Sequence, residues 1–83
     1  MYLHIGHDLL VPERLIIGLF SRDLLETSPD LRYLYHQRRV DKKVVGDLRE
    51  AKTVILTDDK IYLSNITAQT LLRRVERRGP AFE

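Results

Sequence analysis

Apolar and polar positions follow two different patterns in the N-terminal third of the chain. They alternate over residues 1–5, which predicts a β-strand. Residues 6–8 have the composition of a turn, and residues 9–11 predict a second short strand that Pro12 interrupts. The continuous apolar run at residues 15–20 is too short for a stable helix and predicts a buried central strand. An antiparallel unit of two or three strands is therefore expected.

A helix is predicted over residues 28–40. Ser28 can accept a hydrogen bond from a free backbone N–H at the helix start, and Pro29 occupies a position where no N–H donor is needed. The apolar positions of this segment share one face and are Leu31, Leu34 and Tyr35. The helix is expected to end by Val40.

The second half of the chain predicts a hairpin followed by another helix. Residues 41–50 are mostly polar and fit either one weak strand or a loop, whereas residues 52–57 and 60–64 predict two strands joined by a turn at Asp58 and Asp59. Thr67 is the expected N-cap of the last helix. Its apolar stripe is Ala68, Leu71, Leu72 and Val75, and Gly79-Pro80 is its expected end.

These elements predict an α+β fold. A small antiparallel sheet, made of the N-terminal strands and the C-terminal-half hairpin, would pack with two helices. Residues 1–79 are expected to form a single domain, followed by a short tail at residues 80–83. A chain of 83 residues has a thin core, so self-association into a homo-oligomer is expected.

Composition excludes several classes of protein. The chain has no cysteine, so it has no disulfide, thiolate metal site or thiol nucleophile. Its longest apolar run is far shorter than the roughly 20 residues that span a bilayer, and residues 1–6 do not resemble a signal peptide. We therefore expect a cytoplasmic protein that does not interact with membranes.

No combination of side chains indicates catalysis. His4 and His7 are three positions apart, so on a strand they point to opposite faces and are not expected to bind a metal. Asp58 and Asp59 fit a turn better than carboxylate chemistry. The serines lack a nucleophile-elbow context, and the four glycines are too scattered for a phosphate loop. We expect neither an enzyme, a cofactor nor a small-molecule substrate.

Basic residues are more informative than the net charge of +2. They cluster at residues 38–43 and 73–78 and suit anionic partners. The last helix carries a candidate secondary basic surface formed by Arg73, Arg74, Arg77 and Arg78. The alternatives are a favourable interaction with the helix dipole, or pairing with Asp58 and Asp59 of a neighbouring subunit.

Several segments resemble a known family when they are taken in order. They are residues 1–8 (MYLHIGHD), 11–20 (VPERLIIGLF), 52–56 (KTVIL), 60–64 (KIYLS) and 66–74. This set is similar to the RemA/RemB family of bacterial extracellular-matrix, or biofilm, regulators. The resemblance extends over residues 1–75, with a poorer match at residues 22–50.

The resemblance implies an oligomeric, ring-forming regulator that binds double-stranded DNA, with a fold related to the LytTR domain. In this family, an arginine before the third strand and a basic pair before the hairpin contact DNA. Arg14 stands at the first position, and Arg49 and Lys52 stand at the second. Glu50 lies where another basic residue is expected, and its carboxylate would repel phosphate. The alternative function is a protein-interaction or scaffold module that does not bind DNA.

Overall fold

The computed structural model describes residues 1–78, and the side chains of residues 1–75. Its elements are β1 (Tyr2–His4), β2 (Leu10–Pro12), a 3₁₀ turn η1 (Glu13–Leu15), β3 (Ile16–Ser21), α1 (Leu24–Thr27), α2 (Pro29–Val40), β4 (Val44–Val45), a 3₁₀ turn η2 (Leu48–Glu50), β5 (Thr53–Thr57), β6 (Ile61–Ser64) and α3 (Ala68–Arg78). The predicted α+β class is confirmed. Three elements are additions to the sequence-based prediction: the turn η1, the short helix α1 and the turn η2.

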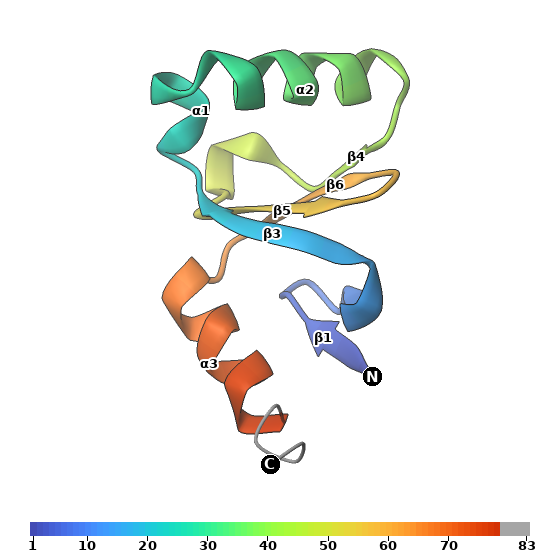
Figure 1. Cartoon of the computed structure of the whole chain (residues 1–83), viewed down its shortest axis with the longest axis vertical. Coiled ribbons are helices and arrows are strands. Elements are labelled where there is room, and N and C mark those ends of the chain that lie inside the picture. The colour runs from blue at the N-terminus through green and yellow to red at the C-terminus, as the bar shows by residue number, and fades with distance from the viewer. Residues whose placement is uncertain (79–83) are drawn as a thin grey trace.

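A four-stranded sheet forms the middle layer of the molecule. Its strand order is β3-β5-β6-β4, with antiparallel pairing except between β4 and β6, which are parallel. Helices α1 and α2 lie on one face of this sheet, and α3 lies on the other face with β1 (Figure 1). Strands β1 and β2 form a separate antiparallel pair. The described residues therefore form two sheets instead of the one expected from the sequence.

Strand β3 lies at an edge of the sheet, which corrects the prediction of a buried central strand. Its apolar run has another cause: both faces of the strand are covered. Phe20 packs into the core beneath α2, and Leu19 packs into the core beneath α3. Ile17 sits at an irregularity in the pairing with β5 and is 66% exposed.

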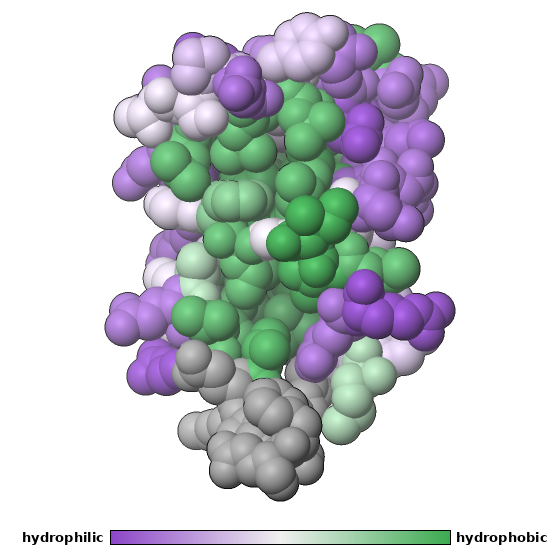
Figure 2. All heavy atoms as spheres, in the orientation of Figure 1, coloured by the Kyte–Doolittle hydropathy of each residue, from purple (hydrophilic) through white to green (hydrophobic). Residues whose placement is uncertain are grey.

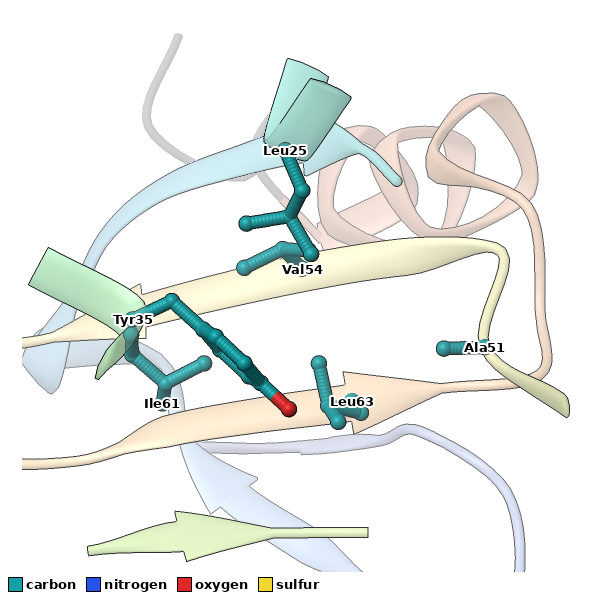
Figure 3. Close-up of a cluster of buried hydrophobic side chains, with 6 residues drawn as sticks. All are labelled: Leu25, Tyr35, Ala51, Val54, Ile61 and Leu63. Carbon is teal, nitrogen blue, oxygen red and sulfur yellow. The ribbon is translucent and has the colours of Figure 1, made fainter. Parts of the chain in front are cut away.

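Two hydrophobic cores lie on opposite faces of the four-stranded sheet. Strand β5 contributes side chains to both cores, because Val54 and Ile55 point to opposite sides of the sheet. Figure 3 shows the core on the α2 side, where the ring of Tyr35 reaches over β6 and Leu25 lies over Val54. The second core contains Leu3, Ile5, Val11, Ile55 and Leu71. It joins the N-terminal strands to α3.

The predicted helix starts are confirmed. The Ser28 side chain accepts a hydrogen bond from the Leu31 amide at 3.3 Å, and α2 ends at Val40. At the start of α3, the Thr67 hydroxyl accepts a hydrogen bond from the backbone amide three residues later at 3.3 Å. Gly79 and Pro80, the expected end of α3, lie outside the described residues.

The predicted apolar stripe of α3 is only partly buried. Leu71 is completely buried, whereas Leu72 is 50% exposed. The two leucines are neighbours in the sequence and therefore lie about 100° apart around the helix. A core that contacts one side of α3 covers Leu71 more fully than Leu72.

Candidate nucleic-acid interface

Arg14 lies in the turn η1, directly before the edge strand β3, and its side chain is exposed. Among the described residues it has no hydrogen-bond or ion-pair partner. Ile16 at the start of β3 pairs with Thr57 at the end of β5. Arg14 is therefore at the end of the sheet where β5 turns into β6, and its guanidinium is available to an external anion.

Lys52 lies at the opposite end of the sheet, directly before β5. Its backbone is held on both sides: the amide donates to the Ser64 carbonyl at 2.7 Å, and its carbonyl accepts from the Arg22 amide at 3.1 Å. Within the described part of the chain, its exposed ammonium group has no partner. Five residue steps along β3 separate the two ends of the sheet, which corresponds to about 16 Å. Arg14 and Lys52 of one protomer are therefore attached at opposite ends of the sheet and do not belong to one compact basic cluster.

Arg49 is exposed but already paired. In the turn η2, its Nε donates to Asp47 Oδ1 at 3.3 Å and its Nη2 to Asp47 Oδ2 at 3.2 Å. This side-chain hydrogen bond lowers the pKa of Asp47 and raises the pKa of Arg49. Asp47 also caps η2 by accepting the Arg49 amide at 2.9 Å. The positive charge of Arg49 is therefore largely compensated where it stands.

Glu50, the acidic residue beside the predicted contacts, lies close to a histidine. Its Oε1 is 3.5 Å from Nε2 of His7, which sits in the turn between β1 and β2. Both side chains are more than half exposed, so solvent screens this pair strongly. Glu50 nevertheless places a carboxylate two residues before Lys52, as the sequence indicated.

The candidate secondary basic surface on α3 divides into two parts. Arg74 is held against the N-terminal strands, because its Nη1 donates to the carbonyl of His4 at 2.8 Å. Arg73 is exposed and contacts only Thr70 on its own helix, at 3.4 Å. The side chains of Arg77 and Arg78 lie outside the described residues. Of the acidic residues considered as partners in a neighbouring subunit, Asp59 is already bound by Lys43 Nζ at 2.8 Å.

A second concentration of positive charge was not predicted as a site. Between α2 and the segment from β4 to η2 lie two adjoining cavities of about 480 and 360 Å³, which share Tyr35, Arg39 and Leu48. We call this region the α2–η2 groove. Its cationic side chains are Arg22, Arg32, Arg39, Lys42 and Arg49, and its carboxylates are Glu26 and Asp47. The basic cluster at residues 38–43 was one available signal, but only the fold brings Arg22 and Arg49 to it.

The described residues contain no cluster with metal-binding composition. In this part of the chain, no three histidine, cysteine, aspartate or glutamate side chains are grouped so that they could hold a metal ion. The described helices are all too short or too polar to cross a membrane. The surface features that remain are exposed cations, the α2–η2 groove and the outer edge of β3.

Together, these features describe a small α+β binding domain whose candidate contacts are cationic. The family model of RemA-like proteins, described as "Extracellular matrix regulatory protein A-like", matches residues 2–75. "Extracellular matrix regulatory protein B" of Bacillus subtilis (strain 168) is 30% identical over 77 residues, which cover 92% of this chain and 91% of that protein. The chain belongs to the RemA-like family. The resemblance found in the sequence is thereby confirmed, and the names of this family and relative describe regulatory proteins.

Proposed function

We propose that the chain is a regulator of extracellular-matrix genes that binds double-stranded DNA as a homo-oligomer through Arg14, Arg49 and Lys52. Membership of the RemA-like family over residues 2–75 is the observation that carries this proposal. The exposed side chains of Arg14 and Lys52, which have no partner among the described residues, support it. Arg49 would contribute less, because Asp47 compensates its charge.

The expected recognition is of the DNA backbone and its shape. The proposed contacts are cations, which bind phosphate groups without reading the base sequence. Sequence preference would then come from how easily the duplex bends. With about two phosphates neutralised by each protomer and four protomers on one duplex, the logarithm of the binding constant should fall with the logarithm of salt concentration with a slope of about −7.

The edge strand β3 supports the proposed self-association. No strand among residues 1–78 pairs with its outer side, so backbone donors and acceptors there are open to another chain. Figure 2 shows hydrophobic residues gathered down the middle of the face on which β3 lies nearest the viewer, with hydrophilic residues on either side. Ile17 is 66% exposed and Leu72 is 50% exposed. Between β3 and α3 lies an apolar hollow lined by Leu19, Ala68, Gln69 and Leu72.

DNA binding is tested by fluorescence anisotropy with a labelled duplex of about 30 base pairs over a salt series. Arg14→Glu and Lys52→Glu should each weaken binding at least tenfold, which corresponds to about 1.4 kcal/mol. The matched control is a cation outside the proposed contacts. A control at Arg32 would not be independent, because Arg32 lines the α2–η2 groove with Arg49, so the control used is Lys43→Glu. It changes the net charge by the same amount, and Lys43 lies before β4, at the sheet edge opposite β3 and outside the groove.

Two outcomes would contradict the DNA proposal in different ways. An absence of binding by the parent protein at low salt would exclude the DNA function. An equal loss with Lys43→Glu would show that overall charge, and not the proposed contacts, determines the affinity. Circular dichroism of each variant confirms that the loss does not come from unfolding.

Self-association is tested by light scattering coupled to size-exclusion chromatography. Ile17→Asp should lower the molar mass to that of the monomer, because a carboxylate at this edge would be buried by a neighbouring chain. Tyr33→Asp is the control, since Tyr33 is 68% exposed but lies on α2, away from β3. A parent protein that is already monomeric, or equal effects of both substitutions, would exclude β3 as the contact.

The second candidate function is a protein-interaction module without DNA binding. Two observations favour it: the apolar surface along β3, and the carboxylate of Glu50 close to Lys52. In that case, the anisotropy titration shows no binding at low salt while the assembly through β3 persists. The two functions are therefore separated by the same pair of measurements.

A further inference from the structure

The α2–η2 groove combines cationic side chains from both of its sides with apolar groups. Arg39 and Lys42 come from the end of α2 and the turn after it, and Arg49 comes from η2. Leu48 and the largely buried Tyr35 provide an apolar floor shared by both cavities. Cavities of a few hundred Å³ with apolar walls and several convergent polar groups are typical of small-molecule sites.

Positive charge in the groove exceeds what the chain carries as a whole. Five cationic side chains and two carboxylates line it, which leaves three positive charges in excess. The net charge of the entire sequence is +2, so the rest of the chain carries one net negative charge. The groove therefore concentrates positive charge, which favours the binding of an anion.

Most of these cations have no anionic partner close by. Arg32 and Lys42 have no side-chain partner among the described residues. Arg39 donates only to the neutral hydroxyl of Tyr35, at 3.4 Å. Arg22 forms an i,i+4 ion pair with Glu26, in which Nη1 lies 4.0 Å from Oε2 without a hydrogen bond.

The guanidinium of Arg22 provides an independent indication. Its Nε is buried and has no hydrogen-bond partner among the described residues. Buried polar groups are normally satisfied, and an isolated donor on a charged group is a particularly unfavourable case. Because the Nε itself is shielded, an anion in the groove would pair with the terminal nitrogens of this partly exposed guanidinium, whose planar geometry suits a carboxylate or phosphate.

We propose that the α2–η2 groove binds a small phosphorylated organic ligand of nucleotide size. The excess of three positive charges matches a ligand with two or three phosphates better than a single carboxylate, because each phosphate group contributes at least one negative charge. The apolar floor formed by Tyr35 and Leu48 would contact the organic part. This site includes Arg49 but neither Arg14 nor Lys52, and it does not depend on the proposed DNA function.

The test is calorimetric titration of the full chain, without DNA, at 0.15 M salt. The probes are ATP, inorganic tripolyphosphate, which lacks the organic group, and adenosine, which lacks the phosphates. ATP should bind at one site per chain, tripolyphosphate at least fivefold more weakly, and adenosine not measurably. No heat with either ATP or tripolyphosphate at 5 mM would overturn the proposal.

Substitutions locate the site. Arg22→Gln and Lys42→Gln should each weaken ATP binding at least tenfold, and Lys42 is exposed enough that its replacement leaves folding intact. Lys60→Gln is the matched control, because Lys60 is an exposed cation in the turn between β5 and β6, outside the groove. Equal weakening by Lys60→Gln would show binding to overall charge and would contradict a groove site. Displacement of ATP by duplex DNA together with loss of DNA binding in Lys42→Gln would assign the groove to DNA instead.

Discussion

Replacing Leu71 by alanine should strongly destabilise the protein, and the same change at the adjacent Leu72 should not. Both leucines belong to the apolar stripe of α3, and the sequence gives no reason to separate them. In the structure Leu71 is completely buried in the core that joins α3 to β1 and β2, whereas Leu72 is 50% exposed. The pair therefore tests how α3 is rotated against the sheet.

The expected magnitude follows from burial. Replacing a fully buried leucine by alanine lowers the free energy of unfolding by about 3 kcal/mol, because apolar contacts are lost and a cavity is left behind. A chain of 83 residues has a total stability of roughly 4–12 kcal/mol. Leu71→Ala should therefore lower Tm by about 12–24 °C. For Leu72→Ala, the half-exposed side chain suggests a loss of about 0.5 kcal/mol.

Urea and thermal unfolding, followed by far-ultraviolet circular dichroism, measure this difference. Circular dichroism is suitable because the chain has no tryptophan. Both variants are compared at one protein concentration, after their molar masses are shown to be equal, since self-association raises apparent stability. Equal losses for the two variants, or a greater loss for Leu72→Ala, would refute the packing of α3 described above.

Three further changes test other parts of the structure. Gly46→Ala should lower stability by about 1–3 kcal/mol in urea unfolding, because Gly46 has a φ of 115° and a Cβ there would lie 2.6 Å from the Leu63 carbonyl oxygen. Ser28→Ala should cost about 1 kcal/mol in the same assay through loss of the α2 cap. The hydrogen bond from Lys43 lowers the pKa of Asp59 below its ordinary value of 3.8. The stability that this interaction contributes is therefore complete above that pH and is lost as the pH falls further. Asp59→Asn should remove this part of the acid dependence in unfolding measured between pH 2 and 6.

Local sequence signals predicted most of the secondary structure, because they depend on neighbouring residues. Ser28 with Pro29 marked the start of α2, and the alternation before and after Asp58 marked the hairpin of β5 and β6. The position of β3 could not be predicted in this way. An apolar run reports that both faces of a strand are covered, and it does not distinguish a central strand from an edge strand packed between two helical layers.

For the predicted binding residues, too, local sequence signals did not give the arrangement in space. The resemblance named Arg14 and Lys52 as contacts, but only the strand register shows that these exposed residues lie at opposite ends of the sheet. Nothing in the order of residues indicated that Asp47 engages Arg49 through two side-chain hydrogen bonds. The α2–η2 groove was missed because its cations come from four separate segments, and their excess charge exists only after folding.

The separation of Arg14 and Lys52 links DNA binding to assembly. Because these cations are about 16 Å apart along β3, one protomer offers a duplex two isolated contacts and no continuous basic surface. Repetition of the protomer would place the Arg14 of one copy and the Lys52 of others along the same duplex. A protein kept monomeric by Ile17→Asp should therefore show a salt slope of about −2, compared with about −7 for four protomers. A slope that stays steep in a proven monomer would mean that DNA contacts a different surface, and the α2–η2 groove would then be the first candidate.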